Sequence, residues 1–211
     1  GPGGNIPLRF YDTRETRDPG PVVIFIHGGG FVIGDLDVYH ALCTEICRQL
    51  DLPVVSVDYR LAPEHPFPAA PDDCEAAARW VASSPPELGR EVTGLVITGD
   101  SAGGNLAAAV SIMVRDRNGP ALRHQLLIYP ALDASCSASS FGTEFPGFLS
   151  SAQMRWYWSQ YAPDRNGKTL ASDWRASPMA GLIGPDTPSA TIIVAGNDPL
   201  HDEAVAYAHK L

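Results

Sequence analysis

The sequence of 211 residues carries 24 acidic and 15 basic side chains, for a formal net charge of −9. Nucleic acids and anionic membranes bind basic surfaces, so this balance excludes both as expected partners and fits an enzyme for uncharged small molecules. With 45% hydrophobic residues the chain can build a core, and its length predicts a single domain over residues 1–211.

The chain alternates strand-like and helix-like segments. In chain order, apolar or alternating runs predict strands at residues 5–11, 22–26, 54–57, 95–98, 125–129 and 191–195. Helical periodicity predicts helices at residues 42–50, from Pro71 onward, at 106–114, at 154–161 and toward Leu211. This alternation predicts a mostly parallel, doubly wound sheet with helices on both faces. Working residues of such sheets lie beyond the carboxyl ends of the strands.

Several side chains have structural interpretations. Cys43 and Cys47 fall on the apolar face of a predicted helix and are expected as buried thiols rather than metal ligands. Asp72 and Asp73 are expected to cap the helix that begins near Pro71. The aromatic side chains within residues 156–161 are expected in the core. Free thiols, with no leader and no stretch of membrane-spanning length, predict a cytoplasmic protein without a membrane partner.

The segment Gly99-Asp100-Ser101-Ala102-Gly103 joins a predicted strand to a predicted helix. The pattern G-x-S-x-G in that setting is typical of a nucleophile elbow, a tight turn that presents a serine hydroxyl at the top of a sheet. Glycine is needed on both sides because a Cβ two positions from the serine would collide with the neighbouring strand and helix. Ser101 is therefore the candidate nucleophile.

A second glycine run, His27-Gly28-Gly29-Gly30, directly follows the strand predicted at residues 22–26. We expect the backbone N–H groups of Gly28, Gly29 and Ala102 to form a three-donor oxyanion hole. A phosphate-binding turn is the alternative, but the chain lacks a Walker lysine, because its only lysines are Lys168 and Lys210. Neither a cofactor nor a metal is expected.

The sequence resembles the hormone-sensitive-lipase-like group of bacterial esterases, often called family IV. The segments that carry the resemblance are His27-Gly28-Gly29-Gly30-Phe31, residues 58–70, residues 99–105 and Asp198-Pro199-Leu200. The resemblance implies an α/β-hydrolase fold, hydrolysis of short-chain carboxylic esters and Ser101 as nucleophile. It also implies Asp198 as the acid that orients a histidine, and Gly28, Gly29 and Ala102 as the oxyanion hole.

The chain departs from the family pattern at both ends. Most of the N-terminal cap and the last strand are expected to be missing, so the chain is interpreted as a fragment with an open sheet edge, through which it would self-associate. Hydrolases of this fold keep the order Ser, Asp, His, and the catalytic histidine is expected beyond Leu211. His209, within the last predicted helix, is a weak substitute.

Two further functions remain open from the sequence. One is a non-catalytic ligand-binding module on a hydrolase fold. The other is a peptide or lactone hydrolase that uses the same machinery. If the base is missing, the chain alone is expected to be poorly active, because removal of the base from a triad lowers turnover on the order of a millionfold.

Overall fold

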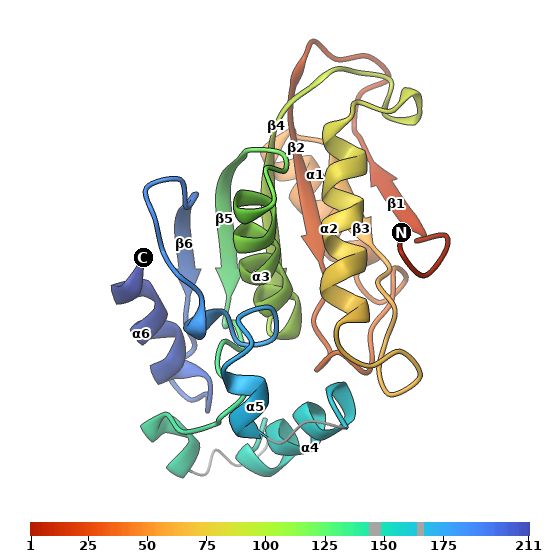
Figure 1. Ribbon diagram of the computed structural model, residues 1–211. Helices are drawn as coiled ribbons and strands as arrows, with labels where there is room; N and C mark the ends of the chain where they lie inside the picture. Colours follow the sequence, from red (N-terminus) through yellow and green to blue (C-terminus); the bar gives the residue numbers. More distant parts are fainter. Residues whose placement is uncertain (144–148, 164–166) are drawn as a thin grey trace.

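The computed structural model describes residues 1–143, 149–163 and 167–211 (Figure 1). Within them one sheet contains β1 (Leu8–Tyr11), β2 (Gly20–Ile26), β3 (Val54–Val57), β4 (Val92–Asp100), β5 (Leu122–Ile128) and β6 (Ser189–Ile193). The strand order is β1-β3-β2-β4-β5-β6. Strand β1 is antiparallel to β3, and every other pairing is parallel. The predicted mostly parallel α/β sheet is confirmed.

The helices connect successive strands or follow them. They are α1 (His40–Leu50), α2 (Ala69–Ala82), α3 (Ala102–Asp116), α4 (Ser151–Tyr161), α5 (Gly167–Ala171) and α6 (His201–Lys210), with short 3-10 helices η1 (Pro86–Leu88), η2 (Ser139–Gly142) and η3 (Pro178–Ala180). In Figure 1, α4 and α5 lie beyond the carboxyl ends of the strands, where the fold predicts a site.

The alternation of side chains along β2 explains the two layers of helices. Val22, Ile24 and Ile26 are buried in the larger hydrophobic cluster, which includes side chains of α2 and α3. Val23 and Phe25 point to the opposite face and pack in a second cluster with Cys43 and Cys47 of α1. Helices therefore cover both faces of the sheet, and the prediction of buried thiols at these two cysteines is confirmed.

Helix α3 is the most deeply buried of these helices. Every residue from Ala102 to Val114 is buried, because Gly, Ala and Ser at most positions allow close approach to the sheet and to α2. The helix begins directly after Ser101, so the candidate nucleophile directly precedes a buried helix of the core.

Two local predictions differ from the structure. Helix α2 begins at Ala69 rather than Pro71, so Asp73 lies in its second turn and is no cap. The buried carboxylate of Asp73 instead accepts from Arg60 Nε and Nη2, each at 2.8 Å, and from the Arg60 backbone N–H at 3.1 Å. Strand β5 begins at Leu122, three residues before the predicted start, because its polar first half still pairs with β4.

Candidate active site

Ser101 occupies a strained turn between β4 and α3. Its backbone angles are φ 53° and ψ −116°, a conformation that costs a non-glycine residue on the order of 1–3 kcal/mol. The next strand holds it, since the Ser101 N–H donates to the Ile128 carbonyl at 2.9 Å and the Ala131 N–H donates to the Ser101 carbonyl at 3.2 Å. The predicted strand, turn and helix are confirmed, and the serine is partly exposed at the carboxyl edge of the sheet.

Glycines flank the serine for the expected steric reason. A Cβ at Gly99 would lie 2.4 Å from the Ile26 carbonyl oxygen, and one at Gly103 would lie 2.0 Å from the same atom. Real side chains do not tolerate such distances, so only glycine lets β4 and α3 approach the end of β2 this closely. The elbow and the loop after β2 are therefore held side by side.

The loop after β2 bears on the expected oxyanion donors. The Gly28 N–H donates to Asp100 Oδ1 at 2.9 Å and to the Tyr39 hydroxyl at 3.2 Å. The Gly28 N–H is therefore already engaged within the protein, and its placement in the oxyanion hole stays a prediction that this contact argues against. The next residues, Gly29 and Gly30, have φ 115° and 61°, and their N–H groups have no acceptor among the residues that the structure describes.

Asp100 and Tyr39 form the polar centre beneath this loop. Asp100 Oδ2 accepts a hydrogen bond from the Tyr39 hydroxyl at 2.9 Å. Burial raises the pKa of the Asp100 carboxyl, and the hydrogen bonds from Tyr39 and Gly28 oppose that rise. Burial beside the same carboxylate raises the pKa of Tyr39. Both side chains were missed as site residues in the sequence, although Asp100 directly precedes the serine.

Asp198 lies at the same edge of the sheet as Ser101, two strands away. The Ser101 N–H reaches Ile128 at the end of β5, and the Tyr129 N–H donates to the Ile193 carbonyl of β6 at 2.7 Å. Asp198 follows β6 and is 3% exposed. Burial raises the pKa of its carboxyl, and the Leu200 N–H, which donates to Oδ1 at 2.9 Å, opposes that rise.

A polar pocket opens above Asp198. It has a volume of about 240 Å³ and is lined by Ser139, Ser140, Thr143, Gly196, Asp198, His201 and Asp202. Asp198 therefore lies at the wall of a space large enough for a further polar side chain.

No histidine of residues 1–143, 149–163 and 167–211 forms a hydrogen bond with Ser101 or Asp198. His27 is fully buried, stacks on Tyr59 at 4.3 Å between ring centroids and has Nδ1 2.8 Å from the Gly28 carbonyl oxygen. Burial lowers the pKa of the imidazole, and the hydrogen bond with the Gly28 backbone opposes that shift. The Tyr59 hydroxyl donates to the His27 carbonyl at 2.8 Å, so the residue is held from both its ring and its backbone. His209 is exposed in the last turn of α6.

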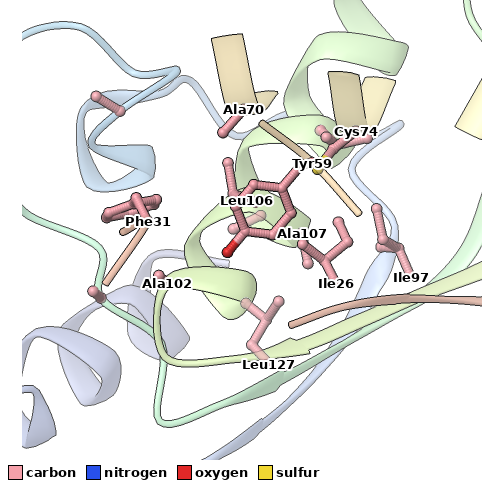
Figure 2. Close-up of a cluster of buried hydrophobic side chains, with 14 of the residues drawn as sticks. Ile26, Phe31, Tyr59, Ala70, Cys74, Ile97, Ala102, Leu106, Ala107 and Leu127 are labelled. Carbon is pink, nitrogen blue, oxygen red and sulfur yellow. The ribbon is translucent and has the colours of Figure 1, made fainter. Parts of the chain in front are cut away.

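Aromatic side chains of α4 cover the glycine loop. Tyr161 stacks on Phe31 at 3.9 Å between centroids, and Trp158 lies 5.2 Å from Phe31. Both are buried, as expected, whereas Trp156 is 51% exposed and is not part of the core. Phe31, Ala102 and Leu106 belong to one cluster of buried side chains, labelled in Figure 2, which includes both the loop after β2 and the start of α3.

Glu203 is a further buried carboxyl near the site that the sequence did not reveal. Its Oε1 accepts from the Leu132 N–H at 2.6 Å, which fastens α6 to the segment after β5. Burial raises the pKa of Glu203 to about 8. Glu203 lies in the first turn of α6, five residues after Asp198. The sequence does not distinguish it as a buried carboxyl, because acidic residues are common in the first turn of a helix.

The described residues lack both a membrane-spanning helix and a group of metal-binding side chains. No helix among them is long and apolar enough to cross a membrane. They also contain no group of three or more histidine, cysteine, aspartate or glutamate side chains placed to hold a metal ion.

A mostly parallel sheet whose β4 ends in a strained turn at Ser101, beside a glycine loop, is the arrangement typical of the α/β-hydrolase fold. A profile described as alpha/beta hydrolase fold matches residues 23–211. The chain belongs to this family, and the resemblance to family IV esterases is confirmed.

Curated relatives and solved structures agree with this assignment. The chain is 41% identical over 217 residues to the carboxylic ester hydrolase LipN of Mycobacterium tuberculosis. This alignment covers 100% of the chain and 57% of LipN. It is 37% identical to an ethyl acetate hydrolase of Pseudomonas putida, over 99% of this chain and 66% of that protein. A hyperthermophilic esterase from Pyrobaculum calidifontis superposes with a TM-score of 0.91 at 40% identity, over 99% of this chain and 66% of the other. The chain thus spans less than two thirds of the length of these relatives.

Proposed function

We propose that the protein is a serine carboxylesterase that hydrolyses short-chain carboxylic esters through an acyl-enzyme on Ser101. The observation that carries the proposal is the backbone of Ser101, held at φ 53° at the start of α3 beside a loop in which the Gly29 and Gly30 N–H groups have no acceptor among the described residues. Relatives named as ester hydrolases, at about 40% identity over the whole chain, support the substrate class.

In this proposal the Ser101 hydroxyl attacks the carbonyl carbon of the ester. The negative charge that forms on the carbonyl oxygen is stabilised by the N–H groups of Gly29, Gly30 and Ala102. Ala102 contributes as the first residue of α3, where the helix dipole also favours negative charge. Each donor of this kind stabilises the transition state by about 3 kcal/mol. Gly30 takes the place that the sequence gave to Gly28, because the Gly28 N–H is engaged by Asp100.

The alcohol leaves from the tetrahedral intermediate, and water then hydrolyses the acyl-enzyme by the same route. Both steps need a base, and we propose a histidine oriented by Asp198. The pocket above the Asp198 carboxylate has room for an imidazole. The order Ser, Asp, His of this fold favours a residue later in the protein than Leu211.

We also propose a cytoplasmic location. Four free cysteines support a reducing compartment such as the cytoplasm.

The test is hydrolysis of p-nitrophenyl acetate, butyrate and decanoate by the protein as its gene encodes it. We expect turnover that favours the shorter esters and that falls at least about 10⁴-fold in Ser101→Ala, because the nucleophile is lost. Ser111→Ala is the matched control, since Ser111 lies within α3, the helix that follows Ser101, and its hydroxyl donates to the Ala107 carbonyl at 2.8 Å. Absence of turnover in the unsubstituted protein, with retained binding of an ester, would favour a ligand-binding module instead.

A further inference from the structure

A single carboxylate joins three segments of the chain beneath the glycine loop. The ladder between β2 and β4 ends at the pair Ile26 and Gly99. The backbone of Asp100, the next residue of β4, pairs with Ile128 on the other side. Its side chain turns toward the loop after β2, accepts from the Gly28 N–H and thereby extends the contact of β4 with β2 by one more hydrogen bond.

The second oxygen of this carboxylate is also engaged. Asp100 Oδ2 accepts from the hydroxyl of Tyr39, which precedes α1 on the opposite face of the sheet from α3. Asp100 is 8% exposed, so both hydrogen bonds lie away from solvent. There is no room for a side chain at Gly28, because its Cβ would lie 2.4 Å from Asp100 Oδ2. The contact therefore fixes the loop backbone directly.

The engaged Gly28 N–H determines where the next donors point. While one peptide N–H is held by Asp100, the following residues, Gly29 and Gly30, turn at positive φ, and their N–H groups meet no acceptor in the part of the chain that the structure describes. Oxyanion donors act only within about 2.7–3.1 Å of the developing charge. A misplacement of about 1 Å at such a site costs on the order of 10²-fold in rate.

We propose that Asp100, held by Tyr39, is a positioning residue that sets the oxyanion donors of the glycine loop relative to Ser101. This inference rests on the proposed esterase function and adds to it a residue that touches neither substrate nor nucleophile. In this role the Asp100 side chain couples the loop after β2 to the end of β4.

Kinetics of Asp100→Ala, Asp100→Asn and Tyr39→Phe test the proposal, with Asp100→Asn and Tyr39→Phe chosen to conserve shape. We expect kcat for p-nitrophenyl butyrate to fall about 10²-fold in Asp100→Ala and less in the other two, with KM changed less than about threefold. The inhibition constant of an aryl trifluoromethyl ketone, which forms an oxyanion adduct, should rise in parallel with the fall in kcat/KM.

Glu75→Gln is the matched control for general loss of stability. Glu75 is also a buried carboxylate, 6% exposed, and it pairs with Arg79 at 2.8 Å and with Arg117. Arg117 follows the end of α3 opposite to Ser101, a helix length of about 22 Å away. This variant should keep kcat and the inhibition constant. Unchanged kcat and inhibitor affinity in Asp100→Asn and Tyr39→Phe would overturn the proposal.

A second measurement does not depend on turnover. With ¹⁵N-glycine labelling, the Gly28 amide proton should exchange slowly with solvent, those of Gly29 and Gly30 quickly, and Asp100→Ala should remove the difference. Equal exchange at the three glycines in the unsubstituted protein would refute the coupling, whether or not esters are hydrolysed. Slow exchange at Gly28 in a protein without turnover would contradict the esterase function and leave the contact itself in place.

Discussion

The ring of Tyr157 lies directly against Gly30, so that a Cβ added to Gly30 would be 2.2 Å from Tyr157 Cδ1. Helix α4 is thus pressed onto the loop that carries the proposed oxyanion donors. The loop is confined from two sides, by Asp100 beneath Gly28 and by an aromatic ring over Gly30.

The first prediction concerns this contact. Gly30→Ala should destabilise the protein by more than the roughly 1–2 kcal/mol that positive φ costs an L-residue, because the methyl group also collides with the ring. Gly89→Ala is the matched control, with φ 62° against 61° and no atom within 4 Å of an added Cβ. Urea unfolding of both variants measures the difference. An equal loss of stability in the two variants would show that the Tyr157 ring moves aside without an energetic penalty.

The second prediction is a pH dependence. Burial raises the Glu203 pKa from 4.5 to about 8. Between these values the folded chain retains a proton that the unfolded chain releases, so the free energy of unfolding should fall as pH rises. Glu203→Gln, which stays neutral, should lack this contribution and gain stability relative to the parent between pH 5 and 9. Urea titrations at several pH values measure the free energy of unfolding of both proteins. Parallel curves of this free energy against pH would contradict the prediction.

The third prediction concerns Asn105, in the first turn after the nucleophile. Its Nδ2 donates to the carbonyls of Ala131 at 2.6 Å and Ala176 at 2.7 Å. Asn105→Asp should destabilise by about 3–5 kcal/mol, because a buried charge would face two carbonyl oxygens. Asn105→Ala, which removes the donors without adding charge, should cost about 1–3 kcal/mol. Circular dichroism in urea gives both values, and an inverted order would show that the aspartate is accommodated as a protonated acid.

The fourth prediction compares a buried with an exposed ion pair. Asp73→Ala should cost at least about 3 kcal/mol, since it removes three acceptor contacts from Arg60 and opens a buried site. Glu45→Ala, which removes the exposed partner of Arg48, should cost less than about 1 kcal/mol. Thermal unfolding of the two variants measures the contrast. A similar cost for both would mean that burial contributes little at Asp73.

Local patterns predicted the scaffold well because they have local causes. The strand before Ser101 contains the apolar run Leu95-Val96-Ile97, the turn is marked by Gly99 and Gly103, and small residues are frequent in the helix that follows. Each of these signals lies within a few positions of the element it specifies. The sheet edge at which Ser101 and Asp198 lie then follows from the rule that working residues lie beyond the carboxyl ends of parallel strands.

The sequence failed where a polar group is satisfied by a distant segment. The N–H of Gly28 is engaged by a carboxylate 72 positions away, and no local pattern indicates that its partner is Asp100. Asp73 shows the same limit, because an acidic residue near a helix start looks like a cap until the fold brings Arg60 beside it. Such pairs depend on register and helix placement, which the sequence alone leaves open.

The burial of α3 has a consequence for heat inactivation. The helix that begins at Ala102 is enclosed by the sheet and by α2, so the peptide group of Ser101 cannot rearrange without disrupting the core. No small, local opening is available to this part of the site. Loss of the Ser101 turn geometry on heating should therefore coincide with global unfolding, and the proposed esterase activity should be lost in the same transition as the fold rather than at a lower temperature.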